Sequence, residues 1–359
     1  MRIVSLSLLR ASPAVSIFFF FQFSLAVASI NSFTLFPPSS KSLNVDGIQN
    51  KQLRGPVSKN RNKMLLFVSV INLQGSIERQ SLTNRMLEQG ILSIAKFYPG
   101  ASVLILYGEV GKKPELKLST RINVQIEEVK TSCFNLEKEY TSYGRMKAYS
   151  EVITNELKRS VPRGIIFYDA DMLFIGNHLR GIFYSSIKDW TVGLTFRNMK
   201  KFPVNCGLML VSQHNLLRGL QFWSEILFYY EKETTFQGSV IRKENPMADQ
   251  LATCKVIESL GGYYMKPIEH VRRLRSMNET SILLLPTKRW NWTPKPMCYI
   301  DSRCAVLHFK GNKKIHMAKA SKLLHNSKDT KPSNIFRDIA KLGQDPRSTR
   351  RTLKKGCSD

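Results

Sequence analysis

The sequence predicts an α/β protein built on a doubly wound, mostly parallel sheet in a single domain. From residue 64 onwards, short apolar runs rich in β-branched residues alternate with segments of helical periodicity. The chain has 359 residues, of which 43% are hydrophobic, so it can bury one large core. Strands that alternate with helices pack as a parallel sheet covered on both faces.

The first elements form a β-α-β unit. Residues 64–71 (MLLFVSVI) are the first predicted strand, and residues 101–107 (ASVLILY) are the second. Between them, residues 81–98 carry apolar side chains at helical spacing. Residues 122–129 are a third predicted strand, and residues 145–158 are a second amphipathic helix. Each strand is therefore expected to pair with a neighbour of the same direction.

The strand that follows ends on two carboxylates. Residues 164–174 (GIIFYDADMLF) are an apolar run interrupted by Asp169 and Asp171. Ligands of open α/β sheets bind outside the carboxyl ends of the strands, so these two residues are candidate site residues. Paired carboxylates suit a divalent cation such as Mn²⁺ or Mg²⁺, which in turn suits a diphosphate. An acidic turn without a metal is the alternative at this point.

The rest of the chain continues the alternation. The predicted strands and helices, in order, are residues 191–196, 206–212, 216–230 (helix), 247–260 (helix), 282–285 and 305–307, with one more helical stretch beyond about residue 318. Cys206 lies in an apolar strand and is predicted to be a buried thiol.

Several polar residues stand at the ends of these elements. Asn205 and Gly207 begin a strand, where a glycine permits close approach of a ligand, although an ordinary turn has the same residues. Asp249 and Gln250 open a helix, either as a favourable first-turn carboxylate or facing a bound sugar. His308 follows an apolar strand and precedes a basic, glycine-containing segment, so it could complete a metal site.

Four motifs in this order resemble those of GT-A fold glycosyltransferases, closest to the glycogenin-like family eight. They are FYDADMLFIGN (167–177), NCGLML (205–210), ADQ (248–250) and HFKGNKK (308–314). The resemblance covers about residues 64–316. It implies a nucleotide-diphospho-sugar transferase fold and transfer of a sugar from a nucleotide-diphosphate donor, most simply a UDP-sugar, to a hydroxyl of a protein, glycan or lipid. It also suggests retention of anomeric configuration.

The resemblance assigns roles residue by residue. Asp169, Asp171 and His308 would hold Mn²⁺ (or Mg²⁺) on the donor diphosphate. Gly311 and Lys314 would close on the diphosphate, and Lys147, on the helix that also carries Arg145, would be a further cation.

The same resemblance places Asn205 and Gly207 in the donor-sugar pocket and Asp249 and Gln250 at the reacting centre. The family's Pro-Trp after the last lysine is replaced by Ile315 and His316.

The ends of the chain predict a location. Residues 1–30 combine early arginines with a long apolar run, as in a cleaved signal peptide or a type II membrane anchor. Residues 31–62 are a predicted stem, residues 63–318 the transferase domain, and residues 319–359 a basic tail. The expected location is the secretory pathway, in the Golgi lumen or as a type II Golgi membrane protein. Sequons at Asn278 and Asn291 agree with it.

Two other functions compete with this one. The net charge of +27 could indicate a basic, polyanion-binding luminal protein, but the chain lacks the interleaved aromatic and basic residues of RNA-binding domains, so no nucleic-acid partner is expected. A phosphatase with an Asp-x-Asp nucleophile is the enzymatic rival. In such an enzyme the acidic strand would open the domain, whereas here it follows a series of strands and helices.

Overall fold

The structure, a computed structural model, describes thirteen segments of the chain. They are residues 64–71, 76–108, 113–118, 122–129, 142–184, 189–197, 199, 202–242, 245, 247–261, 271–275, 280–293 and 304–326. The predicted targeting segment, the stem, the tail beyond residue 326, and the sequon asparagine Asn278 lie outside these segments. No helix within them is long and apolar enough to cross a membrane.

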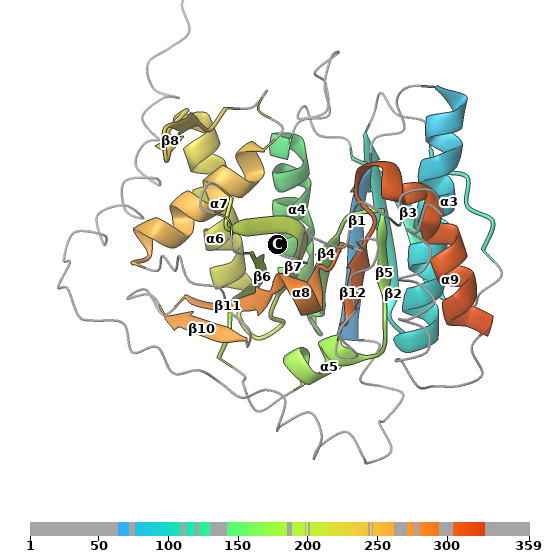
Figure 1. Ribbon diagram of the computed structural model, residues 1–359. Helices are drawn as coiled ribbons and strands as arrows, with labels where there is room; N and C mark the ends of the chain where they lie inside the picture. The colour runs from blue at the N-terminus through green and yellow to red at the C-terminus, as the bar shows by residue number, and fades with distance from the viewer. Residues whose placement is uncertain are drawn as a thin grey trace, which may run out of the picture. The chain divides into compact units, whose positions relative to one another are not determined.

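Eight strands form the main sheet, in the order β10-β11-β6-β7-β4-β1-β2-β3 (Figure 1). Their bounds are β1 Leu65–Ile71, β2 Ser102–Gly108, β3 Asn123–Val129, β4 Gly164–Tyr168, β6 Val192–Phe196, β7 Val204–Val211, β10 Arg272–Arg275 and β11 Ser281–Pro286. Strands β3, β2, β1 and β4 are mutually parallel, and so are β11 and β6. Strands β7 and β10 run antiparallel to their neighbours. The predicted α/β class with a mostly parallel sheet is confirmed.

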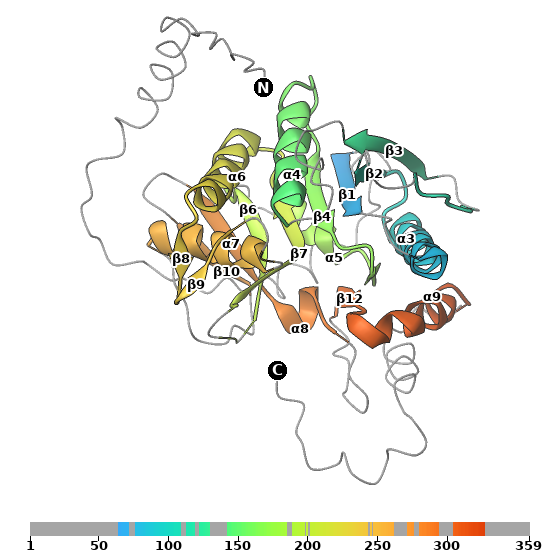
Figure 2. The ribbon, with the colours of Figure 1, turned by 90° about the horizontal axis from the view of Figure 1, so that it is seen from above.

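Helices cover both faces of this sheet, as predicted. Alternate residues of β1 point to opposite faces, so Leu66 and Val68 belong to one apolar cluster while Leu65 and Phe67 belong to another. Helices α4 (Ser142–Leu157), α6 (Leu216–Glu231) and α7 (Ala248–Ser259) contribute to the first cluster. Helices α3 (Ile77–Phe97) and α5 (His178–Phe183) contribute to the second. Figure 2 shows α4 and α6 on one side of the sheet and α3 on the other.

Helix α3 begins four residues before the predicted start. The hydroxyl of Ser76 accepts a hydrogen bond from the backbone N–H of Arg79 at 3.3 Å and so caps the helix. The first turn is exposed, and Ile77 is 76% accessible, so apolar periodicity could not reveal it.

The predicted strand over residues 164–174 is two strands in two different sheets. Strand β4 belongs to the main sheet, whereas β5 (Met172–Phe174) pairs antiparallel with β12 (Val306–His308). The chain turns between them, where the N–H of Met172 donates to the carbonyl of Asp169 at 3.2 Å. Both strands are apolar and buried, which is why the sequence presents them as one run.

Helix α9 (Met317–Asn326) packs against the small β5–β12 sheet. This helix and α3 enclose an apolar cluster that includes Met86, Leu173, Phe309 and Met317. Figure 1 shows α9 beside α3. Residues 304–326 are thereby fixed against the amino-terminal half of the domain.

Several short elements were not predicted. They are α5, the hairpin β8 (Thr235–Phe236) and β9 (Ser239–Val240), strand β10, helix α8 (Thr287–Trp290) and the 3-10 helix η2 (Gly311–His316). Such segments are too short to show periodicity, and β10 has the sequence RRLR, in which no apolar alternation exists.

A bulge in β7 shapes the region next to the acidic turn. Leu194 of β6 pairs with Met209, but the next residue, Thr195, pairs with Asn205, so the intervening residues of β7 have no partner on β6. Gly207 lies in this bulge, and its carbonyl accepts a hydrogen bond from the N–H of Asp169 at 2.9 Å. Cys206 beside it is buried with a free thiol, as predicted.

Candidate active site

The two acidic residues lie in the turn that connects the two sheets. Asp169 directly follows β4, and Asp171 directly precedes β5. The side chain of Asp171 is 10% exposed, whereas that of Asp169 is 27% exposed. The turn places both carboxylates at the carboxyl end of β4, which is where ligands of open α/β sheets bind.

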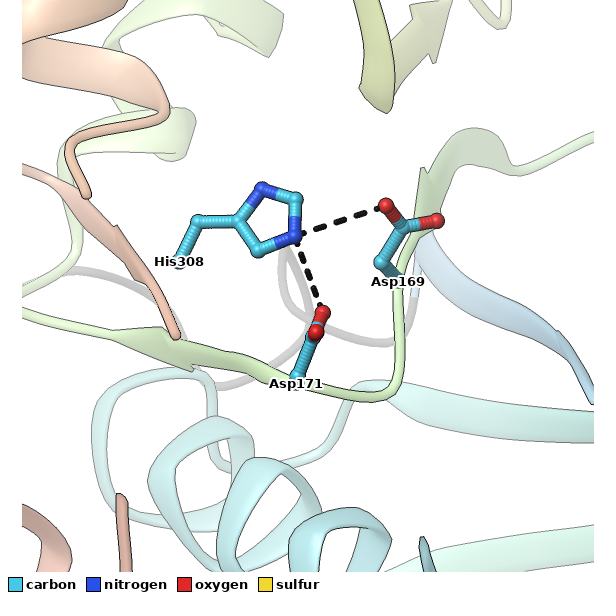
Figure 3. Close-up of side chains that lie close together, drawn as sticks. All are labelled: Asp169, Asp171 and His308. Carbon is cyan, nitrogen blue, oxygen red and sulfur yellow. Dashed lines mark ion pairs between the residues drawn. The ribbon is translucent and has the colours of Figure 1, made fainter. Parts of the chain in front are cut away.

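His308 reaches the same place from the far end of the domain. Strand pairing brings His308 opposite Met172, and the N–H of Phe309 donates to the carbonyl of Asp171 at 2.8 Å. The His308 Nε2 atom lies 2.9 Å from Oδ1 of Asp171 and 3.5 Å from Oδ2 of Asp169. Figure 3 shows this nitrogen pointing toward both carboxylates. The structure therefore brings the three predicted metal ligands together.

Gly207 makes this convergence possible. A Cβ at position 207 would lie 2.7 Å from Oδ2 of Asp169, 2.8 Å from Cε1 of His308 and 2.9 Å from Cε of Met172. Side chains do not approach so closely, so a larger residue would displace the two ligand groups. Gly207 thus has a role in the structure of the site itself.

A chain of hydrogen bonds supports His308 from behind. Its Nδ1 lies 2.7 Å from Oδ1 of Asn291, whose Nδ2 donates to the hydroxyl of Thr195 at 3.0 Å. The Thr195 hydroxyl in turn donates to the carbonyl of Asn205 at 2.6 Å. Because the Thr195 hydroxyl proton is used in this bond, the hydroxyl can only accept from Asn291, so the NH₂ group of Asn291 faces Thr195. The amide oxygen of Asn291 therefore faces the ring of His308. The Nδ1 atom of His308 therefore carries a proton.

This tautomer has a consequence for the other ring nitrogen. With Nδ1 protonated, Nε2 presents a lone pair to two carboxylates unless a second proton or a metal ion lies between them. The ligand atoms of Asp169, Asp171 and His308 all lie within 4.8 Å of one another. Two carboxylate oxygens and one imidazole nitrogen suit Mn²⁺, and Mg²⁺ less well because it prefers oxygen ligands. The residues present therefore fit the predicted divalent ion.

Lys314 adds a cation at this end of the site. Its Nζ lies 3.3 Å from Oδ2 of Asp171. Burial raises the pKa of Asp171, but the hydrogen bond and charge of His308 and the charge of Lys314 outweigh it, so the pKa is lowered overall. Lys314 belongs to η2, which begins at Gly311 with a positive φ of 58° that favours glycine.

At the other end, Arg145 links two carboxylates. Its Nη1 lies 2.8 Å from Oδ1 of Asp169, and its Nη2 forms an ion pair with Oδ2 of Asp249. Asp249 is 1% exposed, and burial raises its pKa, while the charge of Arg145 opposes that shift. Arg145 therefore holds the predicted reacting-centre carboxylate next to the metal end.

Lys147 lies elsewhere on the same helix. Its Nζ is 5.3 Å from the centre of the Tyr143 ring, and its charge acts on Glu151. Arg145 of α4 contacts the acidic turn, and the role of Lys147 toward a donor diphosphate stays a prediction.

The predicted sugar-pocket residues are partly occupied by contacts within the protein. Oδ1 of Asn205 accepts from the N–H of Gly207 at 3.1 Å. Oε1 of Gln250 accepts from Nη2 of Arg197 at 2.5 Å, and the N–H of Gln250 donates to Oδ1 of Asp249 at 2.8 Å. Gln250 and Asp249 therefore have fixed orientations beside the cations of the site.

Sequence reasoning did not find Arg197, Asn291 or Thr195, and it named Lys310 only as a basic neighbour of His308. Asn291 was interpreted as a glycosylation acceptor, but its side chain is fully buried and both of its amide groups are hydrogen bonded. A glycan cannot be attached to it in the folded protein. Asn291 directly follows α8 (Thr287–Trp290), which is too short to be predicted from the sequence, so its burial had no sequence signal.

Comparison with known proteins gives structural likeness only. No protein-family model matches the sequence, and no curated protein matches it. A glycosyltransferase involved in the glycosylation of the major capsid of PBCV-1 shares 12% identity over 72% of this chain and 98% of its own, with a TM-score of 0.40. The galactosyltransferase LgtC, solved with donor and acceptor sugar analogs, shares 13% sequence identity with this chain. The match covers 73% of this chain and 95% of LgtC, with a TM-score of 0.42. Both are glycosyltransferases.

Proposed function

We propose that this protein is a metal-dependent glycosyltransferase of the GT-A type, related to the glycogenin-like family eight, which moves a sugar from a nucleotide-diphosphate donor to a hydroxyl group. The observation that carries the proposal is the convergence of Asp169, Asp171 and His308, with Lys314 beside Asp171. Two motifs from distant parts of the chain form one cation site next to a lysine, an arrangement suited to a diphosphate.

The bound ion would neutralise the negative charge that develops on the departing diphosphate. Lys314 would add a second positive charge there, once its contact with Asp171 is shared with a phosphate oxygen. His308, held by Asn291, keeps its Nε2 toward the two carboxylates and so maintains the shape of the site before a donor binds.

The transfer itself breaks one bond and forms one. The bond from the anomeric carbon to the phosphate oxygen breaks, and its electron pair leaves with the nucleoside diphosphate. The acceptor oxygen bonds to the anomeric carbon, and its proton passes to a phosphate oxygen. In a retaining reaction of this kind, Asp249 would stabilise the cationic sugar, because Arg145 favours its ionised form. Gln250 would contact the sugar beside it.

The phosphatase alternative needs a carboxylate that is free to attack phosphorus. Oδ1 of Asp169 is bound by Arg145, and Asp171 contacts both His308 and Lys314. These contacts reduce the nucleophilicity of both groups and therefore favour the transferase.

We further propose that the donor is a UDP-sugar and that the protein acts in the Golgi, as a luminal or type II membrane protein. The support is the amino-terminal pattern of early arginines followed by an apolar run. The acceptor would be a hydroxyl of a protein, glycan or lipid.

A donor screen tests the function. The full-length protein in detergent is incubated with Mn²⁺ and a panel of nucleotide sugars, and release of free nucleoside diphosphate is measured. We expect release from at least one donor, and Asp171→Ala should lower it about 10³-fold, since the metal supplies several kcal/mol.

The control for that screen is Asp189→Ala, which removes a carboxylate whose side chain is 78% exposed and which lies before the first residue of β6, Val192. It should release nucleotide at the wild-type rate. Cleavage of phosphomonoesters without release from any nucleotide sugar would refute the transferase and support the phosphatase.

A further inference from the structure

The cations of the site fall into two groups. Arg145 and Lys314 each form an ion pair with a carboxylate of the site. Arg197 and Lys310, here called the unpaired cations, form no ion pair with any residue of the described segments. The carboxylates of Asp169 and Asp171 act on Lys310, and that of Asp249 acts on Arg197, but within the described segments neither cation has a carboxylate at ion-pair distance.

Lys310 faces the site because of strand alternation. Its backbone angles, φ −78° and ψ 146°, are extended and continue β12 beyond His308. Phe309 packs into the apolar cluster with α9, so Lys310 points to the same side as His308, about 6.6 Å further along the chain. The charges of Asp169, Arg197 and Asp171 all act on it.

Arg197 lies at the sugar end of the proposed site. Its Nε donates to the carbonyl of Phe202 at 2.5 Å, and its Nη2 donates to Oε1 of Gln250 at 2.5 Å. Both acceptors are neutral, so these bonds orient the guanidinium without neutralising it. Arg197 is half-buried, as is Lys310.

Two half-buried positive charges that act on each other are unfavourable unless an anion binds between them. The diphosphate of a donor would bind at the metal ligands and Lys314. Of the unpaired cations, Lys310 lies two residues after the metal ligand His308, and Arg197 contacts Gln250, which is the residue proposed to contact the sugar. An anionic group on the sugar itself is the ligand chemistry that fits them.

The charge balance agrees with this reasoning. Among the described residues, the site has four cations and three carboxylates, namely Arg145, Arg197, Lys310 and Lys314 against Asp169, Asp171 and Asp249. A divalent ion would leave three positive charges in all. A nucleoside diphosphate linked to a neutral sugar offsets two of them, and one carboxylate on the sugar offsets the third.

We propose that the donor sugar carries a carboxylate, as in a hexuronic acid, and that Lys310 and Arg197 bind this carboxylate. The inference depends on the proposed transferase function and adds the substrate class. The carboxylate takes no part in the bond that breaks. It selects the donor, since a neutral sugar would leave the unpaired cations without a partner.

The test compares three ligands: UDP, UDP-glucose and UDP-glucuronic acid. Dissociation constants are measured with Mn²⁺ on the full-length protein. We expect the wild type to bind UDP-glucuronic acid at least ~10-fold more tightly than UDP-glucose, as one charged hydrogen bond provides. This comparison needs no variant, so misfolding cannot obscure it.

Variants then locate the preference. Lys310→Met should abolish the preference while leaving the affinity for UDP unchanged, and Lys310→Arg should retain it. Lys319→Met, which changes an exposed lysine of α9, should bind as the wild type does. Thermal unfolding of each variant shows whether it folds.

Three results would overturn the inference. The first is equal affinity of the wild type for the two donors. The second is a Lys310→Met variant that loses affinity for UDP as much as for UDP-glucuronic acid, because Lys310 would then contact the diphosphate. The third is wild-type protein that neither binds nor cleaves any nucleotide sugar, which would refute the transferase function as well. Turnover of UDP-glucose without the preference would refute the uronic-acid donor alone.

Discussion

Asp171 and Asp249 are two buried aspartates at opposite ends of one site, and their surroundings act on their charges in opposite directions. Burial raises the pKa of each, but only at Asp171 do the neighbouring His308 and Lys314 reverse the shift. At Asp249 the charge of Arg145 opposes burial without overcoming it. The metal end is thus prepared for a charged ligand, whereas the charge of Asp249 is supported chiefly by Arg145, with a hydrogen bond from the N–H of Gln250.

The largest expected effect comes from removing that arginine. Arg145→Met would leave Asp249 buried without its partner and should lower the free energy of unfolding by about 3–5 kcal/mol. The measurement is urea unfolding of the metal-free protein at pH 7.

Lys147→Met is the matched control, since it removes a cation two residues along the same helix. It loses the contact with the Tyr143 ring and the charge that acts on Glu151, and should cost less than ~1 kcal/mol. Similar losses for the two variants would mean that Asp249 does not depend on Arg145.

An intermediate effect is expected behind the metal end. Asn291→Leu removes the acceptor for Nδ1 of His308 and should weaken Mn²⁺ binding 10–100-fold, roughly the usual effect of such a supporting residue. Asn291→Asp keeps an acceptor and should recover part of the affinity. Mn²⁺ binding is followed by electron paramagnetic resonance of the free ion.

Asn215→Leu is the control for that series, because its amide donates to the carbonyl of Trp190, away from the metal end. Equal Mn²⁺ affinity in all three variants would remove Asn291 from the support of the site. A loss of affinity only in variants with a lower melting temperature would indicate general destabilisation.

The smallest effect is a pair of opposite pH dependences in the metal-free protein. Because the folded-state pKa of Asp171 is lowered from 3.8, its contribution to stability is present above that value and is lost as the pH falls through the folded-state pKa. Asp249 has a raised pKa, so its contribution is full below 3.8 and is lost as the pH rises through the folded-state pKa.

The measurement compares Asp171→Asn and Asp249→Asn with the wild type by urea unfolding between pH 3 and 7. The stability of the wild type relative to Asp171→Asn should increase with pH, and that relative to Asp249→Asn should decrease. Slopes of the same sign would show that the two environments do not differ as described.

The two halves of the main sheet differ in how far the sequence predicts them. Helix α3 joins β1 to β2 and helix α4 joins β3 to β4, and a helical crossover of this kind lets the two strands that it joins run parallel. The reversed direction of β7 was not predicted, although only seven residues separate Phe196 from Val204. So short a connection cannot make the crossover that a parallel pair needs.

Site residues could be predicted where their position depends only on the strand that they follow. Asp169, Asp171 and His308 follow apolar strands, so their place at strand ends could be inferred from the sequence. The choice between Arg145 and Lys147 could not, because the partner Asp249 belongs to α7 and its position depends on how that helix packs against α4. The burial of Asn291 likewise depends on tertiary packing, whereas a sequon is a pattern of three residues.

In the secretory location that we propose, the buried amide of Asn291 would link the site to the biogenesis of the chain. In the secretory pathway, oligosaccharides are attached to sequons while a polypeptide is still unfolded. A molecule modified at Asn291 could not bury that side chain, and its His308 would lose the hydrogen bond that fixes the ring. Glycosylation at this sequon would therefore compete with the burial of Asn291 that supports the proposed metal site.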